Sequence, residues 1–249
     1  MKTFLGQATV FLTASLATST GMAQRPLGID VSSFQGSINW TSAHGDGVEF
    51  AFAHATSGAG GHDTYYHTNM LHGKSAGVLM AAYHVADPGL NTPAVEASNF
   101  WNFAKSDIKA DGKTLSPAIT FDDFSGHVGA TSYTQWFNKW SSDVIADAAA
   151  AGLVLRPVII CSAGSGACDL TTNITLGPFI ANYNGENLYT GSPWSCCTSC
   201  NPWGGTNWTY WQVSSTGSIS GISGNVDLDT FNGSVAELKA MELVTAITE

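Results

Sequence analysis

Short runs of almost continuous apolar residues recur along the chain from Leu27 onward. They are LGIDV, VEFAFAHA, GVLMAAYHV, PAITFD, LRPVIIC, GPFIANY and TYWQV, and a last short run lies in GNVDLDTF. Strands that are apolar at nearly every position are buried on both faces, which is typical of parallel sheets covered by helices. This recurrence is the strongest constraint that the sequence places on its fold.

Several stretches between these runs have helical patterns. Residues 92–107 open with Thr-Pro and place Val95, Phe100 and Phe103 near one face, and residues 133–152 end in an alanine run followed by glycine. Residues 24–249 contain neither a low-complexity linker nor an internal repeat. The alternation predicts one α/β domain over residues 24–249, a single irregular TIM-like β/α barrel.

The first 23 residues have the pattern of a signal peptide. They contain one early lysine, a middle of apolar and small residues, and Gly-Met-Ala before the expected cut. The apolar stretch is too short and too rich in Ser and Thr to cross a bilayer, which takes roughly 20 apolar residues. We therefore expect a secreted, extracellular protein without a membrane partner. Four Asn-x-Ser/Thr sites fit a glycosylated surface, at Asn39, Asn173, Asn207 and Asn232.

The composition narrows the classes of partner. The formal net charge is -10, which disfavours nucleic acid, because binding to phosphates depends on Lys and Arg. Eight Trp accompany a charged fraction of only 11%. This mixture occurs in secreted proteins that stack on sugars, and equally in proteins whose aromatic residues form the core. We expect a glycan partner, no nucleic acid and a monomer.

Five Cys in an exported chain predict disulfides and one remaining thiol. Cys161 and Cys168 flank the loop CSAGSGAC, and this pair is the expected bridge. Cys196, Cys197 and Cys200 lie together in SCCTSC, which could also be interpreted as a zinc knuckle. No second ligand pair lies at metal spacing, so we predict neither a metal site nor a cofactor.

Polar residues occupy the ends of the apolar runs. In β/α barrels the chemistry gathers at the C-terminal ends of the strands. The residues at these positions are Asp30, His54, Tyr83, His84, Asp122, Asn182, Tyr183, Trp211 and Gln212, with Asp227 in the final run. Together they predict a polar site at one end of the barrel.

The ordered runs resemble the motifs of a known family. LGIDVSSFQGSINW, GVLMAAYHVADP with AVEASNF after it, FIANY and YWQVSSTGSISGISGNVDLDTF are similar to successive motifs of glycoside hydrolase family 25, the Chalaropsis-type lysozymes. The resemblance spans about Gly28 to Phe231. It implies a flattened barrel of about five β/α units followed by antiparallel strands. It also implies cleavage of the β-1,4 bond between N-acetylmuramic acid and N-acetylglucosamine in peptidoglycan.

The family's catalytic carboxylates carry over in part. The Asp of its first strand corresponds to Asp30, and the Asp of its final VDL segment corresponds to Asp227. The Asp of its Asp-x-Glu pair falls on Thr120 and the Glu falls on Asp122. The resemblance thus assigns catalysis to Asp122, Asp30 and Asp227, with one carboxylate missing from the pair.

A register shifted by one residue would place Phe121 and Asp123 at the Asp-x-Glu positions instead. We prefer the first register, because it directs Ile119 and Phe121 toward inner packing while Thr120 and Asp122 share the opposite face. The remaining candidates would bind substrate: Thr120, Tyr83, His84, Asn182, Tyr183, Trp211 and Gln212.

Other positions also differ from the family pattern. His54 and Ser57 replace the Lys and Glu of Lys-Ala-Thr-Glu, as if a salt bridge had been removed as a unit. Glu96 replaces a Gln, which we expect to be a harmless surface change, and Ile160 replaces a Tyr. Asp229, two residues after Asp227, could share its face, but the more ordinary role, a turn or surface carboxylate, is expected. The segment HDTYYH is expected to be a polar loop.

Three functions remain open from the sequence. Glycoside cleavage needs a protonated acid and stabilisation of an oxocarbenium-like centre, and Asp122 is one methylene shorter than Glu. A misplacement of about 1 Å can cost about 100-fold in rate. The chain is therefore a muramidase of reduced activity, a glycan-binding protein on the same scaffold, or a hydrolase of another amino-sugar polymer such as chitin.

Overall fold

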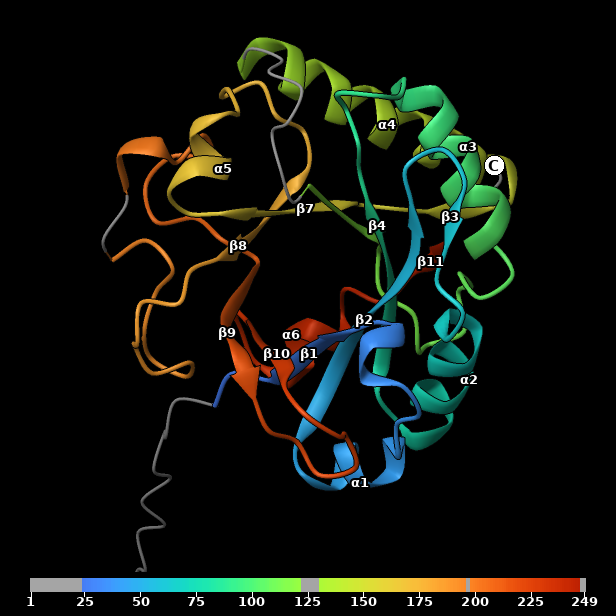
Figure 1. The fold of residues 1–249 in the computed structure, drawn as a ribbon, viewed down its shortest axis with the longest axis vertical. Coiled ribbons are helices and arrows are strands. Elements are labelled where there is room, and N and C mark those ends of the chain that lie inside the picture. The colour runs from blue at the N-terminus through green and yellow to red at the C-terminus, as the bar shows by residue number, and fades with distance from the viewer. Residues whose placement is uncertain (1–23, 122–129, 196–197, 247–249) are drawn as a thin grey trace, which may run out of the picture.

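Eight strands form a closed barrel in the structure, a computed structural model that describes residues 24–121, 130–195 and 198–246. Their order around the barrel is β1-β10-β9-β8-β7-β5-β4-β2, and β1 also pairs with β2, which closes the ring (Figure 1). The strands are β1 (Leu27–Val31), β2 (Val48–Ser57), β4 (Leu79–Val85), β5 (Ala118–Thr120), β7 (Val158–Ser162), β8 (Gly177–Ala181), β9 (Tyr210–Gly217) and β10 (Val226–Phe231). The predicted barrel is confirmed.

Five β/α units come first along the chain. Their helices are α1 (Trp40–Gly45), α2 (Tyr66–Ala76), α3 (Pro93–Ala104), α4 (Ala130–Ala150) and α5 (Ser165–Cys168). The antiparallel part is smaller than expected, because β9 still runs parallel to β8 and only β10 is antiparallel to its neighbours β1 and β9. The shorter elements are η1 (Ser33–Gln35), β3 (Gly61–His62), β6 (Leu153–Val154), η2 (Thr198–Cys200), α6 (Val235–Lys239) and β11 (Val244–Thr245).

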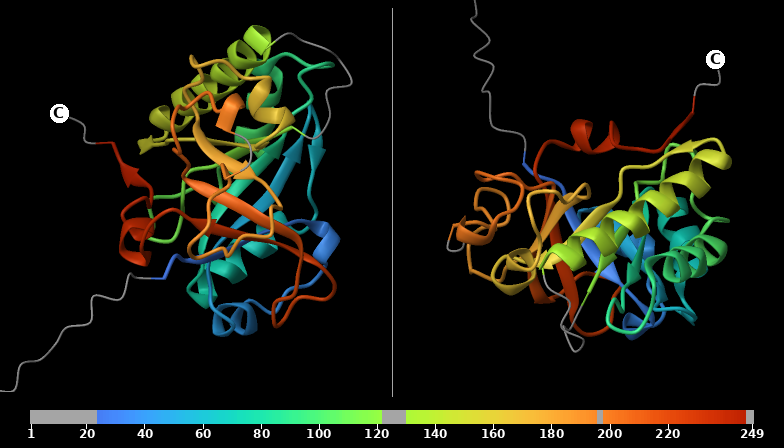
Figure 2. Two further views of the ribbon diagram at one scale, coloured as in Figure 1. Left: turned by 90° about the vertical axis from the view of Figure 1, so that its left-hand side faces the viewer. Right: turned by 90° about the horizontal axis from the view of Figure 1, so that it is seen from above.

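Two separate apolar clusters follow from the alternation of side chains along each strand. The inner cluster fills the barrel with aromatic rings, among them Phe50, Phe52, Phe179 and Tyr210. Gly28 belongs to the same interior, where an added Cβ would lie 2.1 Å from the ring of Phe50. The outer cluster fills the space between the strands and the helices outside the barrel. Figure 2 shows these helices lying against the outside of the strands. The interior is therefore a packed core below its polar end.

Helix α3 covers the outer cluster with a face that differs from the predicted one. Thr92 is its N-cap and Pro93 its first residue, as the sequence predicts. Val95, however, is 49% exposed, and the buried face instead includes Glu96, Phe100 and Trp101. The same rotation of the helix buries Glu96, which was expected on the surface.

The disulfide joins a different pair of cysteines from the expected one. Cys168 at the end of α5 is bonded to Cys200 in η2, and Cys161 is a buried thiol whose pKa is raised by burial. Cys161 lies on β7 and packs into the outer cluster instead of bonding to Cys168. Cys196 and Cys197 lie outside the described residues. Within the described ranges, no helix has both the length and the apolar character to cross a bilayer.

Candidate active site

A cavity of about 390 Å³ opens where the parallel strands end. Its lining includes Asp30, Tyr83, Val85, Thr120, Phe121, Ile160, Cys161, Ser162, Ser165, Gly166, Ala181, Tyr183, Gln212 and Asp227. These residues come from β1, β4, β5, β7, β8, β9 and β10 and from the segments that follow them. Five of the predicted site residues are thereby brought together with Asp227, as the position of the strand ends predicted.

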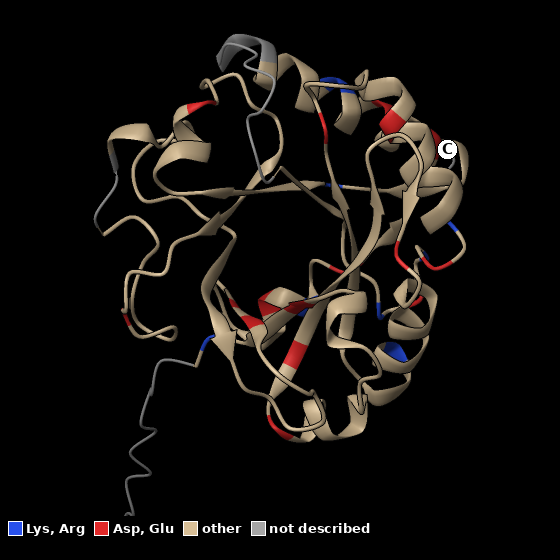
Figure 3. Cartoon of the chain, in the orientation of Figure 1, with Lys and Arg blue, Asp and Glu red and all other residues tan. Residues whose placement is uncertain are grey.

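Two carboxylates face each other across the first and last barrel strands. Asp30 on β1 and Asp227 on β10 are direct partners in the antiparallel register. Residues paired in this way have Cβ atoms about 4.5–5.5 Å apart and side chains on the same face. Figure 3 shows acidic segments on β10 at this side of the barrel. The pair concentrates negative charge at the cavity wall.

Hydrogen bonds hold Asp30 in place. The side-chain amide of Gln212 donates to Asp30 Oδ2 at 2.6 Å, and the hydroxyl of Tyr183 donates to Gln212 Oε1 at 2.7 Å. Burial, and next the charge of Asp227, raise the pKa of Tyr183 to about 12, so its hydroxyl keeps its proton. A chain of three cavity-lining residues, Tyr183, Gln212 and Asp30, therefore orients the carboxylate.

A further buried carboxyl lies behind this pair. Asp229 is fully buried, contrary to the expectation of a surface or turn residue. Burial, followed by the charges of Asp30 and Asp227, raises its pKa well above the usual range. The available signal was the period of two: Asp229 must share the face of Asp227, and that face is the barrel interior.

The strand β5 presents opposite faces at Ile119 and Thr120, as expected. Thr120 lines the cavity, and Ile119 is buried in the outer cluster. Phe121 borders the cavity as well, and its ring lies 4.7 Å from that of Phe137 on α4. Asp122 and Asp123 lie outside the described residues. The assignment of Asp122 as the acid therefore stays a prediction.

His84 does not contact the cavity, and its prediction as a sugar contact is wrong. It is fully buried on the outer face of β4, where its Nε2 lies 2.8 Å from Glu96 Oε2 and its Nδ1 lies 2.7 Å from Thr56 Oγ1. Glu96 also accepts hydrogen bonds from the backbone of Asp87 and the side chain of Asn91. Burial lowers the pKa of His84. The change from Gln to Glu is thus part of a buried network and not a surface change.

Trp211 is likewise unavailable for stacking on a sugar. It is fully buried in the outer cluster, and its Nε1 donates to the carbonyl oxygen of Asn182. The side chain of Asn182 donates to the carbonyl of Pro193, and Asn182 is absent from the cavity lining described above. Among the described residues, the aromatic side chains that line the cavity are those of Tyr83, Phe121 and the half-exposed Tyr183.

The residues that replace the family's Lys and Glu contact each other. His54 Nε2 lies 2.9 Å from Ser57 Oγ and 3.1 Å from the carbonyl oxygen of Thr56. On the other side of the ring, His54 Nδ1 lies 3.4 Å from Asp63 Oδ2, and the ring stacks on Tyr83 at 4.9 Å. This contact supports the interpretation that both positions changed together.

The segment HDTYYH is more ordered than the expected polar loop. His62 belongs to β3, and Asp63 is buried, where it accepts hydrogen bonds from the backbone of Ser33 and Tyr65. His67 lies on α2 and pairs with Asp107. Among the described residues, no group of three or more His, Cys, Asp or Glu is arranged to hold a metal ion.

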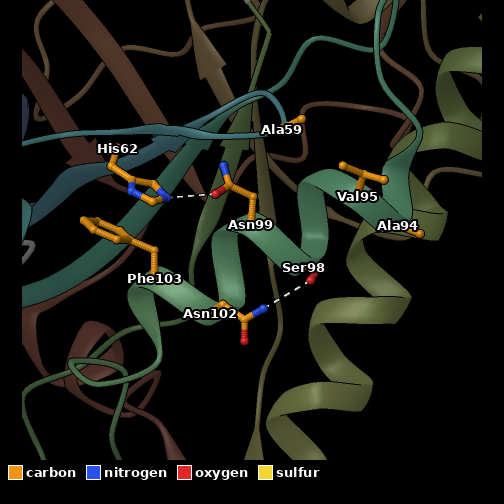
Figure 4. A pocket seen from close by; sticks show the side chains of 8 residues that line it. All are labelled: Ala59, His62, Ala94, Val95, Ser98, Asn99, Asn102 and Phe103. Carbon is orange, nitrogen blue, oxygen red and sulfur yellow. Dashed lines mark hydrogen bonds between the residues drawn. The ribbon is translucent and has the colours of Figure 1, made fainter.

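A second hollow of about 580 Å³ lies on the outer side of α3 (Figure 4). The ring of His62 stacks on Phe103 at 4.1 Å and the side chain of Asn99 lies beside them. The other lining residues are Ala59, Ala94, Val95, Ser98 and Asn102. Because this lining contains no carboxylate, the hollow lacks the groups that acid catalysis of glycoside cleavage needs.

Comparisons by sequence find relatives of this chain among known proteins. The family model described as Glycosyl hydrolases family 25 matches residues 29–222. Lysozyme M1 from Streptomyces globisporus is 32% identical over 225 residues, which cover 88% of this chain and 72% of that protein.

Solved structures share the fold. A bacterial lysozyme from Streptomyces coelicolor superposes with a TM-score of 0.71 at 29% identity, covering 87% of this chain and 96% of the other. A family GH25 lysozyme from Aspergillus fumigatus superposes with a TM-score of 0.67 at 21% identity, covering 87% and 98%. At this identity the second likeness is one of fold alone.

Proposed function

Because this chain belongs to glycosyl hydrolases family 25, a family of lysozyme-type glycosidases, we propose that it cleaves peptidoglycan with reduced efficiency. The bond cut is the β-1,4 bond between N-acetylmuramic acid and N-acetylglucosamine. The observation that carries the proposal is the pairing of Asp30 with Asp227 in a cavity that also contains Tyr83 and Tyr183. Aromatic faces and fixed carboxylates are the groups that a glycosidase cleft requires.

In the proposed mechanism Asp122 gives its proton to the leaving oxygen. Asp30 and Asp227 then supply negative charge beside the oxocarbenium-like centre or orient the N-acetyl group of the substrate. Water attacks the anomeric carbon, and its proton returns to Asp122, which completes the hydrolysis. The hydrogen bond from Gln212 keeps Asp30 from rotating away during this step. Thr120 offers a hydroxyl but no charge in the same cavity. The short acid and the missing carboxylate together account for the reduced rate.

The same cavity also supports a second candidate, a glycan-binding protein. Thr120 lines the cavity at the position where the family resemblance implies a carboxylate, and His54 with Ser57 replaces a charged pair nearby. These changes leave the aromatic residues Tyr83 and Tyr183 able to hold a sugar without cleaving it. Hydrolysis of another amino-sugar polymer, such as chitin, is a third candidate.

We also propose that the protein is exported. Residues 1–23 have the pattern of a signal peptide, and residues 24–249 would form the mature catalytic domain. A disulfide between Cys168 and Cys200 supports an oxidising compartment. The mature protein is proposed to act as a glycosylated monomer.

A hydrolysis assay separates the three functions. Residues 24–249 are incubated with bacterial walls, with soluble peptidoglycan fragments and with chitin between pH 3 and 7, and released reducing ends are measured. We expect release from walls, and a loss of about 100-fold or more in Asp30→Asn. Asp147→Asn is the matched control, because Asp147 is exposed on α4.

Each alternative has its own result. Binding of peptidoglycan fragments in calorimetry without any reducing ends would establish the glycan-binding protein. Release from chitin and not from walls would establish the third function. Neither release nor binding at any pH would exclude all three.

A further inference from the structure

Asp229 has neither a hydrogen bond nor an ion pair within the part of the chain that the structure describes. Both of its carboxyl oxygens are buried and lack a hydrogen-bond partner among those residues. None of the salt bridges found there includes Asp229. An ionised carboxylate in such surroundings is strongly disfavoured, because burial removes its hydration and no hydrogen bond or ion pair from the described residues replaces it.

The neighbouring strands explain why no partner reaches it. Asp229 is paired with Gln212 on β9, but the side-chain nitrogen of Gln212 donates to Asp30, its oxygen accepts from Tyr183, and it makes no bond to Asp229. On the other side it is paired with Gly28 of β1, which has no side chain. Neither neighbouring strand therefore donates a hydrogen bond to the carboxyl group of Asp229.

Within the described parts of the chain, the two charged groups that act on Asp229 are both acidic. Asp227 is two residues away on the same face of β10, and Asp30 lies on β1, opposite Asp227. Tyr183, the other titratable group near the three carboxyls, keeps its proton. When three carboxyl groups interact, each ionisation makes the next one harder, and the set titrates as a unit. The most buried member is the last to lose its proton.

We propose that Asp229 is a positioning residue that retains the one proton of a three-carboxyl set, so that Asp30 and Asp227 carry the charge of the site. With Asp229 neutral, Asp30 can ionise beside Asp227 against one negative charge and not two. When Asp229 ionises, a third charge repels both and disturbs the bond between Gln212 and Asp30. Asp229 thus sets an alkaline limit on a competent site. The part of this inference that concerns catalysis rests on the proposed function.

The retained proton is tested without any substrate. Infrared difference spectra of the folded protein at neutral pH are expected to contain a carbonyl band that the protonated carboxylic acid of Asp229 contributes. That band is expected to be lost in Asp229→Asn and kept in the exposed control Asp147→Asn. Absence of a protonated acid at neutral pH in the unmodified protein would overturn the proposal, and this readout does not depend on whether the variant folds.

The consequence for stability has a definite sign. Asp229 keeps its proton when folded, whereas in the unfolded chain it loses it near the ordinary pKa of about 3.9. The folded state then binds more protons, so stability falls as pH rises from about 4 toward the raised pKa. Asp229→Asn removes this dependence of stability on pH. The melting temperature of the variant, relative to that of the unmodified protein, should therefore increase as pH rises. The proposal would be contradicted if the melting temperatures of the two proteins differed by the same amount at every pH.

The catalytic consequence is read from pH profiles. If the protein hydrolyses walls, Asp229→Asn should retain activity to a pH higher by about one unit or more, since like charges shift pKa values by such amounts. An unchanged alkaline limb would overturn the catalytic role. If no hydrolysis occurs at any pH while the infrared and stability results are as expected, the proposed function is wrong, but the inference that folded Asp229 retains its proton remains supported.

Discussion

Gln212 on β9 donates a hydrogen bond of 2.6 Å to Asp30 on β1, although β10 lies between these two strands in the barrel. The bond crosses the interior above Asp229 and fixes the carboxylate that faces Asp227. Orientation of a reacting group to within about 1 Å accounts for large factors in rate. The placement of Asp30 is therefore as important as its charge.

Replacing Gln212 should lower activity with little effect on binding. In Gln212→Leu the carboxylate of Asp30 loses the hydrogen bond that Gln212 donates and is oriented less precisely, so we expect kcat on wall fragments to fall by about 100-fold at similar KM. Gln135→Leu on the exposed face of α4 is the control. An equal loss in both variants would mean that the effect is one of general stability.

Restoring the family's acid pair should raise activity. Thr120→Asp with Asp122→Glu returns the missing carboxylate to the cavity and lengthens the proposed acid by one methylene. We expect release of reducing ends from walls to increase by about 10-fold or more, because a well-placed general acid contributes about 100-fold or more. A double variant that remains folded and no more active would contradict the assigned register. The shifted pair Phe121→Asp with Asp123→Glu serves as the comparison.

The buried network of Glu96 should tolerate Gln but not Ala. Glu96→Ala leaves His84, the backbone of Asp87 and the amide of Asn91 without an acceptor, so unfolding free energy should fall by about 3 kcal/mol or more. In Glu96→Gln the neutral imidazole can exchange tautomers and accept from the new amide, which limits the loss to about 1 kcal/mol. Urea unfolding measures both, with the exposed Ser98→Ala of the same helix as the control.

His84 should weaken the fold on the acid side. Burial lowers its pKa in the folded state, whereas the unfolded value is about 6.5. Between these values the unfolded chain binds more protons, so stability falls as pH drops below about 6.5. His84→Gln should flatten this part of the curve, and the exposed His72→Gln should not. The slope is opposite in sign to the one expected from Asp229.

The disulfide should contribute substantially to stability. Cys168 and Cys200 are 32 residues apart, and closing a loop of this length is worth roughly 4 kcal/mol in the chain-entropy description. The double variant Cys168→Ser with Cys200→Ser should lose most of this amount in denaturant unfolding. Cys161→Ala should keep the bridge, which peptide mapping without reduction can check. A bridge containing Cys161 in that map would contradict the structure.

The apolar runs predicted the barrel well because each strand is long enough to show its burial in composition alone. Side-chain direction was predicted less well, although the same pattern contained the information. Tyr83 and His84 were both assigned to the groove, yet adjacent residues of a strand face opposite sides. For the same reason Trp211 was wrongly assigned to the groove together with its neighbour Gln212. Applied consistently, the period of two would have excluded both residues and included Asp229.

Other features had no signal in the sequence. The partner of Cys168 depends on how the segment containing η2 returns to α5, which is a property of the whole fold. The burial of Glu96 depends on the rotation of α3 against α4, and one Thr-Pro opening does not fix that rotation. Contacts between distant segments are set by packing and not by local pattern.

The closure of the barrel by β10 has a consequence for biosynthesis. Asp30 emerges from the ribosome early, but its neighbours Gln212 and Asp227 come from the last two barrel strands. Until those strands arrive, β1 has an unpaired edge and the two acids are far apart in the chain. A growing polypeptide therefore contains most of the barrel without a working site. If the proposed function holds, the enzyme would be inert inside the cell that makes it until its final strands are complete.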